Sequence, residues 1–181
     1  MGGGIAIAIA IDFAIDFAID FALSYPGMTA SLIAADSALT GFGWPGGRPS
    51  QGPAKLAQSD GIEAAKQAWL NSDLFIPAGK QPDVVSRLNS TVADYSGWHW
   101  LHENPATAPR KLAIEHLSSI KCPSLIIIGE HDVPDFHEIS DILLSEINGS
   151  RRVTIPNVGH MSNMEAPVAF NAALFDFLET R

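Results

Sequence analysis

The chain opens with a strict alternation of apolar and small or acidic residues. Every odd position from Ile5 to Leu23 is a large apolar residue, and every even position is alanine or aspartate. Read at period two, this is the pattern of a half-buried strand; read at period four, the isoleucines and the phenylalanines form two stripes on roughly opposite sides of a helix. A strand usually has about 5 to 6 residues, and alanine favours helix, so we expect a mostly buried helix over 5–23. If the segment is extended instead, it is an aggregation-prone β-run.

The middle of the chain reads as one strand followed by helices and irregular loops. Residues 29–35 (TASLIAA) predict a short buried strand, and the Pro- and Gly-rich stretch 44–53 (WPGGRPSQGP) predicts a loop or boundary. Residues 61–97 are helical in pattern, with Pro82 at a helix start. A second loop over 102–110 precedes a short helix expected at 112–120.

Past Cys122 the pattern alternates between strand and helix. The apolar, β-branched run in PSLIIIGEHD (123–132) is typical of a strand covered on both faces, and RRVTIPNVGH (151–160) predicts a second strand. Helical patterns follow each of them, over 136–149 and 165–181. This βαβα order indicates an α/β fold with parallel strands and right-handed crossovers.

Composition and charge exclude several classes of protein. Hydrophobic residues make up 46% of the chain and charged residues 17%, which indicates a folded globule. The net charge is −9 without a cluster of Lys or Arg, so nucleic acid is not an expected partner. The single cysteine, Cys122, cannot form an internal disulfide, and we expect a buried, inert thiol in a reducing, cytoplasmic setting.

The apolar opening is not expected to be a membrane or targeting segment. It lacks a basic region and a cleavage site, and Asp12, Asp16 and Asp20 interrupt it. Each carboxylate costs about 2.5 to 3.5 kcal/mol at a bilayer centre, so no membrane association is predicted.

Two ionisable residues follow the two strands of the second half. Asp132 and His160 come at the carboxyl ends of 123–132 and 151–160, which is where open parallel sheets place their ligands. We expect the two to lie side by side, with Asp132 preferred over Asp135 because it follows the strand directly. A strand end followed by a turn scatters neighbouring side chains, so we expect no metal site from the nearby polar residues His131, Asp132, Asp135 and His137.

Two motifs around these residues resemble the α/β-hydrolase superfamily. The first is Gly129-Glu-His-Asp132 with Val133-Pro134, and the second is Gly159-His160-Met161 with Asn163-Met164-Glu165-Ala-Pro167, about thirty residues later. The resemblance implies that Asp132 is the acid and His160 the base of a catalytic triad. It also implies hydrolysis of an ester, lactone or similar bond through an acyl-enzyme, with no metal or organic cofactor.

The family's nucleophile is not found in this sequence. In the family it stands in G-x-S-x-G on a strand-to-helix turn, often with Met-Gly-Gly after the serine. Here MGGG, followed by FALSYPG and SLIAADSAL, is similar to that region beginning just after the serine, and no G-x-S-x-G occurs elsewhere. The serines at 24, 37, 50 and 162 lack the required context.

The resemblance therefore implies an incomplete α/β-hydrolase fold. We expect a short parallel sheet of about three strands with flanking helices and a helical cap insertion. Residues 1–44 would form the helix and strand after the nucleophile, 45–119 the cap, and 120–181 the core that carries acid and base.

The repeats at the start are also unusual for the family. Collapsing the IA and IDFA units to MGGGIAIDFALSYPG leaves an ordinary family helix, so about twelve residues look inserted by duplication. Twelve residues would turn a helix by about 120° beyond three full turns.

Function follows from this reading in two forms. As a hydrolase, the chain would act on a small-molecule substrate once it is complemented by a nucleophile, with Trp69, Trp98, Trp100 and Met161 lining an apolar pocket; alone it would turn over negligibly. The alternative is a non-catalytic domain that self-associates, as a homo-oligomer, or complements a partner fragment through exposed apolar surface.

Overall fold

The computed structural model describes residues 4–9, 15–102 and 112–180, with side chains from residue 17 onward. Its centre is a four-stranded sheet in the order β1-β2-β3-β4, and every neighbouring pair is parallel. The strands are β1 (Gly4–Ile9), β2 (Thr29–Ala35), β3 (Ser124–Gly129) and β4 (Arg151–Ile155). The α/β class and the short parallel sheet are thus confirmed, with four described strands where about three were expected.

The additional strand comes from the alternating segment at the start of the chain. A helix over all of 5–23 was wrong: residues 4–9 form β1, which pairs with β2 from Ile5↔Ser31 to Ile9↔Ala35. The helix α1 covers only Ile15–Ser24. Residues 10–14, and with them part of the repeat, lie outside the described residues. The period-two pattern prevails in β1 because β2 offers a neighbour for its backbone hydrogen bonds, an interaction that no local preference for helix reveals.

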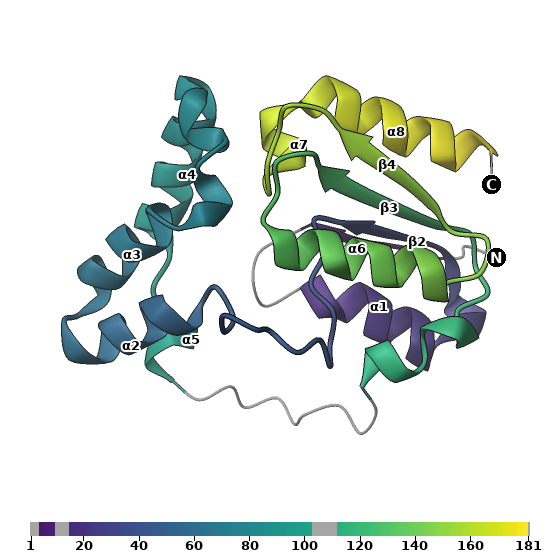
Figure 1. Cartoon of the computed structure of the whole chain (residues 1–181), viewed down its shortest axis with the longest axis horizontal. Coiled ribbons are helices and arrows are strands. Elements are labelled where there is room, and N and C mark those ends of the chain that lie inside the picture. The colour runs from purple at the N-terminus through teal and green to yellow at the C-terminus, as the bar shows by residue number, and fades with distance from the viewer. Residues whose placement is uncertain (1–3, 10–14, 103–111, 181) are drawn as a thin grey trace.

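Side chains from β2 and β3 alternate between two apolar cores. Leu32, Ala34, Ile126 and Ile128 belong to the core shared with α1 and with α6 (Pro134–Glu146). The intervening residues, such as Ile33 and Ile127, belong to the core shared with α8 (Pro167–Thr180). Figure 1 shows α8 on one side of the sheet and α6 and α1 on the other. This two-sided burial explains the nearly continuous apolar runs of β2 and β3.

The second half of the chain follows the order expected from its sequence. β3, α6, β4 and α8 come in that sequence, with a short helix α7 (Ser162–Glu165) between β4 and α8. Pro134 stands at the first turn of α6, where a missing backbone N–H costs nothing. The predicted alternation of strand and helix is confirmed here.

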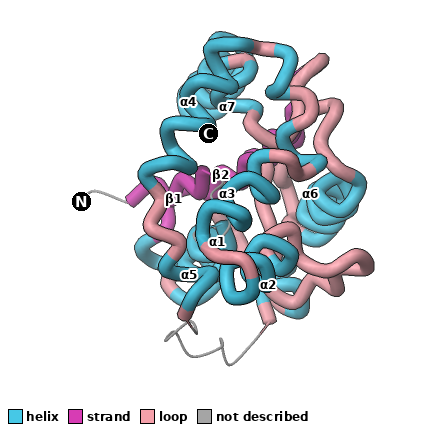
Figure 2. The backbone as a smooth tube through the Cα atoms, turned by 90° about the vertical axis from the view of Figure 1, so that its left-hand side faces the viewer, coloured by secondary structure: helices cyan, strands magenta, loops and turns pink. Residues whose placement is uncertain are grey.

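Between β2 and β3 the chain forms a group of helices beside the sheet. They are α2 (Gln51–Ser59), α3 (Ile62–Leu70), α4 (Pro82–Asp94) and α5 (Trp98–Leu101). The start of α4 at Pro82 was predicted, whereas the loop expected over 44–53 ends earlier, because α2 begins at Gln51 and contains Pro53 in its first turn. Figure 1 shows this group beyond the carboxyl ends of β3 and β4, and Figure 2 views the molecule from the side on which the group lies.

Short 3₁₀ turns complete the chain. They are η1 (Pro26–Met28), η2 (Asp73–Phe75), η3 (Ala78–Lys80), η4 (Ala113–Glu115) and η5 (Leu117–Ser119). The single helix expected at 112–120 is therefore wrong in type, since His116 has φ −131° and interrupts it. Most of the loop expected over 102–110 lies outside the described residues.

In the described part of the chain, no helix is long and apolar enough to cross a membrane. The division into units at 44/45 and 119/120 stays a prediction.

Candidate active site

Two loops meet at the carboxyl edge of the sheet, one after β3 and one after β4. The Glu130 amide donates to the Ile155 carbonyl oxygen at 2.9 Å, and the His131 amide donates to the Val158 carbonyl oxygen at 2.8 Å. Gly129 permits this approach, because a Cβ built there would lie 2.1 Å from the Gly159 carbonyl oxygen. The loop after β3 is called the acid loop (residues 130–133) and the loop after β4 the base loop (residues 156–162).

The contact between the loops places His160 against Asp132. The imidazole Nδ1 lies 3.0 Å and 3.1 Å from the two carboxylate oxygens of Asp132. His160 is 5% exposed and Asp132 is 7% exposed, so water does not compete for this contact. The Phe136 ring of α6 packs against the imidazole with 4.1 Å between ring centroids. A carboxylate at Nδ1 fixes the imidazole tautomer and leaves Nε2 able to accept a proton.

Asp132 has a fixed orientation of its own. Its Oδ1 accepts the backbone amide of Val133 at 2.7 Å. Asp135, the other acid considered from the sequence, lies in the first turn of α6 and is partly exposed. His131 is exposed, and no group of three or more metal-ligating side chains is found among the described residues.

Glu165 holds the base loop on both sides of His160. Its carboxylate accepts the Gly159 amide at 3.0 and 3.1 Å and the Met161 amide at 3.1 Å. Glu165 lies in α7 and is 7% exposed. The two peptide amides that flank the imidazole are thus tied to one buried carboxylate.

A further buried acid, Asp36, stands at the end of β2. Its Oδ1 accepts the Gly129 amide at 3.2 Å, and its Oδ2 accepts the Ser162 amide at 3.0 Å and the Ser162 hydroxyl. Asp36 has φ 45°, in the left-handed region that few non-glycine residues occupy. Burial raises the pKa of Asp36 from 3.8 to about 7; the charge of His160 lowers it and that of Asp132 raises it, both less strongly.

The sequence interpretation gave no role to Asp36 or Glu165. Glu165 was part of the family motif, but a glutamate in a helix start is not distinguishable by sequence from a solvated one. Asp36 follows the buried run 29–35 in the same way that Asp132 follows β3. That strand-end position was the signal that could have found it.

The four residues expected to line a pocket are placed differently from one another. Trp69 packs against Phe75 at 5.4 Å and against Trp100 at 6.2 Å between ring centroids, and both Trp69 and Met161 contact the core that contains Phe136. Trp100 is 4% exposed in a small core among α2, α3 and α5, whereas Trp98 is 41% exposed. The structure thus brings Trp69 and Met161 to the core beside the pair, and Trp98 to the surface. Their role in substrate binding stays a prediction.

The helical group reaches the base loop through Pro77. A Cβ built on Gly159 would lie 2.6 Å from the Pro77 Cγ, so this proline covers the peptide just before His160.

Other nucleophile candidates have local partners. The Ser37 hydroxyl donates to the Ala38 carbonyl oxygen at 2.9 Å, and that of Ser162 donates to Asp36. Cys122 is half-buried instead of fully buried as expected, and burial raises the pKa of its thiol. A raised pKa lowers the thiolate fraction, in keeping with an unreactive thiol; the cytoplasmic location inferred from it stays a prediction.

Comparison with known proteins shows what the chain is similar to. No family model matches the chain. It is 38% identical over 65 residues to mouse serine hydrolase BPHL, a segment that makes up 35% of this chain and 22% of that protein. The fold resembles a hydrolase from Pseudomonas aeruginosa PA01 with a TM-score of 0.71 and 25% identity, over 89% of this chain. The chain thus resembles α/β-hydrolases in its fold, and over 65 residues it resembles a serine hydrolase in its sequence.

The fold also resembles that of an esterase and of a lactonase. A thermophilic esterase from Thermogutta terrifontis has a TM-score of 0.72 at 21% identity, over 90% of this chain and 60% of that one. An enol-lactonase from Burkholderia xenovorans LB400 has a TM-score of 0.69 at 21% identity, over 90% of this chain and 61% of that one. The chain thus spans about three fifths of these solved structures.

Proposed function

We propose that this chain provides the general base and the acid for hydrolysis of an ester, lactone or similar bond in a small molecule. The observation that carries the proposal is the buried contact between His160 Nδ1 and Asp132 at 3.0 Å, at the carboxyl edge of a parallel sheet. The similarity to the Pseudomonas hydrolase and to mouse serine hydrolase BPHL supports this class of reaction.

The proposal gives each of the two residues one step. His160 would take the proton of an attacking hydroxyl at Nε2, and Asp132 would stabilise the imidazolium that forms. On collapse of the tetrahedral intermediate, the same imidazolium would give its proton to the leaving alkoxide. Because both side chains are almost fully buried, their mutual attraction is stronger than it would be in water.

The proposed reaction also requires a nucleophile that these 181 residues do not supply. The 181 residues contain no G-x-S-x-G motif, so the proposed turnover depends on a segment or chain that contributes such a serine. The 181-residue chain alone is expected to hydrolyse p-nitrophenyl esters negligibly above a buffer blank.

A complementation assay tests the proposal. The chain is mixed with the N-terminal part, through the nucleophile serine, of the Pseudomonas hydrolase, and p-nitrophenyl acetate hydrolysis is followed. We expect turnover that needs both polypeptides and is abolished by His160→Gln. Turnover that is equal with wild-type chain and His160→Gln would refute a base role for His160.

Asp132→Asn gives a graded prediction in the same assay. An amide at this position favours the wrong imidazole tautomer, so turnover should fall on the order of 10³- to 10⁴-fold. Asp135→Asn, a partly exposed acid on the adjacent turn, is the matched control and should stay within about threefold of wild type. Equal losses of turnover in the two variants would show that Asp132 is not the acid of the pair.

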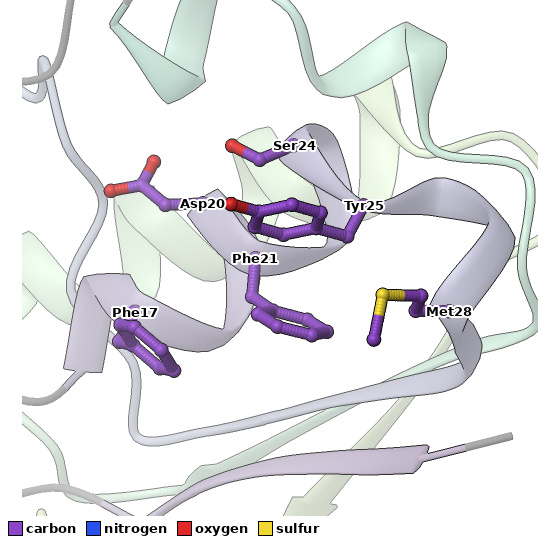
Figure 3. Close-up of a pocket in the computed structure, with 6 residues that line it drawn as sticks. All are labelled: Phe17, Asp20, Phe21, Ser24, Tyr25 and Met28. Atoms are coloured by element: carbon purple, nitrogen blue, oxygen red, sulfur yellow. The ribbon is translucent and has the colours of Figure 1, made fainter.

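The second candidate is a non-catalytic domain that associates through apolar surface. Phe17, Tyr25 and Met28 are 69%, 54% and 60% exposed on one side of α1 and η1. With Asp20, Phe21 and Ser24 they line a hollow of about 420 Å³ (Figure 3). β1 is the outer strand of the described sheet on this flank, so its free backbone edge is a second place for another polypeptide to bind.

A further inference from the structure

Asp36 is a buried acid that neither step of the proposed reaction uses. It is 3% exposed, and its carboxylate is contacted by donors from two different segments. The Gly129 amide belongs to the last residue of β3, just before the acid loop, and the Ser162 amide and hydroxyl end the base loop. One carboxylate therefore connects the carboxyl ends of β2 and β3 with the base loop.

These contacts lie directly beside the catalytic pair. Ser162 is two residues from His160, and Gly129 is three residues from Asp132, whose own amide donates to the Gly129 carbonyl oxygen at 3.2 Å. A displacement of Asp36 would thus shift both halves of the pair. Its left-handed backbone is a further sign of a constrained role, because such a conformation costs free energy at a residue with a Cβ.

We propose that Asp36 is a positioning residue that holds the imidazole of His160 against Asp132 and, once it is ionised, favours the protonated form of that imidazole. The proposal rests on the proposed function of His160 as the base, but it concerns the state of the imidazole before any substrate binds. According to this proposal, two carboxylates act on the imidazole, and each has a different task. Asp132 bonds to the ring, and Asp36 bonds to the loop that carries the ring.

Electrostatics gives the proposal its second half. The ionisable groups that face Asp36 are His160 on the base loop and Asp132 on the acid loop. The charge of His160 lowers the pKa of Asp36 more than the charge of Asp132 raises it. Such coupling is reciprocal, so an ionised Asp36 must favour imidazolium at His160 as imidazolium favours ionised Asp36. Glu165, the other buried acid at this loop, is occupied by the amides of Gly159 and Met161.

The alternative is that Asp36 serves only to tie the fold together. In that case its replacement would lower the melting temperature but would not change the pH at which His160 titrates. The two roles therefore differ in an observable of one identified side chain.

The experiment is an NMR titration of the 181-residue chain, with the His160 imidazole assigned by its loss in His160→Gln. We expect Asp36→Asn to lower the His160 titration midpoint by about one pH unit, because a nearby buried charge is removed. Asp135→Asn, which removes a partly exposed charge near the acid loop, is the control and should change the midpoint by less than about 0.3 unit. A folded Asp36→Asn variant with an unchanged midpoint would overturn the proposal.

Ser162→Ala keeps the test decisive if Asp36→Asn does not fold. This variant retains the charge of Asp36 and loses one tether, so the His160 midpoint should change little. Exchange of the His160 Nδ1 proton with water should become about tenfold faster, as expected for the loss of one hydrogen bond. Unchanged exchange would overturn the positioning role.

No substrate or nucleophile enters these measurements. A failed complementation assay would refute the proposed function and leave the titration result intact. An unchanged midpoint in Asp36→Asn would refute the role of Asp36 and leave the assay intact.

Discussion

At the scale of single residues, three buried acids surround one imidazole at the carboxyl edge of the sheet. Asp36, Asp132 and Glu165 each accept hydrogen bonds from the acid or base loop, and each is nearly inaccessible to water. Glu165 bonds only to backbone amides in the described structure, Asp132 bonds to the ring and the Val133 amide, and Asp36 bonds to amides and a hydroxyl. The three acids are thus distinguished by what they bind, which residue type alone does not reveal.

The raised pKa of Asp36 predicts how stability depends on pH. The folded chain holds the Asp36 proton up to about pH 7, whereas the unfolded chain releases it near 3.8. The contribution of this group to stability is therefore complete below about pH 4 and is lost as the pH rises to about 7, by at most about 4 kcal/mol. Asp36→Asn should remove this dependence.

Urea unfolding at pH 5 and at pH 8 measures it. The stability of Asp36→Asn relative to wild type, given by the difference between their free energies of unfolding, should be higher at pH 8 than at pH 5. The reason is that only the wild type loses the contribution of Asp36 over that range. Taking the difference between the variants cancels the titration of groups that they share. A relative stability that does not change with pH would contradict the assignment of a raised pKa.

At the scale of elements, sequence patterns succeeded where an element is buried by its own neighbours in the chain. β2, β3, β4, α6 and α8 were expected because their apolar periods match the two cores of the sheet. β1 was missed because its alternation fits helix and strand equally, and only pairing with residues more than twenty positions away decides it. The contact of His160 with Asp132 was predictable from strand ends, whereas the contacts of Asp36 depend on the register of three strands.

Gly129 is the element-scale feature on which the meeting of the two loops depends. Gly129→Ala should lower the free energy of unfolding by about 1 to 3 kcal/mol, because its methyl group would overlap the Val158 and Gly159 carbonyl oxygens. Chemical denaturation measures this loss. Gly43→Ala is the matched control, since a Cβ there meets nothing within 4 Å, and it should be nearly neutral. A Gly129→Ala variant as stable as Gly43→Ala would show that the loops separate without cost.

On the scale of the whole molecule, the carboxyl edge of the sheet is covered, whereas the side of α1 carries exposed apolar side chains. The helical group and Pro77 lie over the base loop, whereas the α1 side presents Phe17, Tyr25 and Met28 to solvent. Exposed aromatic residues gathered beside a strand edge favour association with another polypeptide. The sequence indicated apolar surface of this kind but could not place it, because the phenylalanines of the repeat fitted a buried face equally well.

Association through this flank has a direct test. The double variant Phe17→Ser, Tyr25→Ser should weaken concentration-dependent association of the chain by about tenfold or more, since burying one such ring contributes about 1.5 to 3 kcal/mol. Sedimentation velocity over a concentration series measures the change. Phe175→Ser is the control, because Phe175 is 59% exposed on α8, on the other side of the sheet. If both variants weakened association equally, association would be non-specific hydrophobic contact and not binding through the α1 side.

The contacts of Asp36 also have a consequence for synthesis of the chain. They reach across 93 residues to Gly129 and 126 residues to Ser162. At translation rates of about 5 to 20 residues per second, Asp36 leaves the ribosome roughly 6 to 25 seconds before Ser162 does. Gly129 emerges within that interval but Ser162 only at its end, so the full set of Asp36 contacts can form only after β4 and the base loop have emerged.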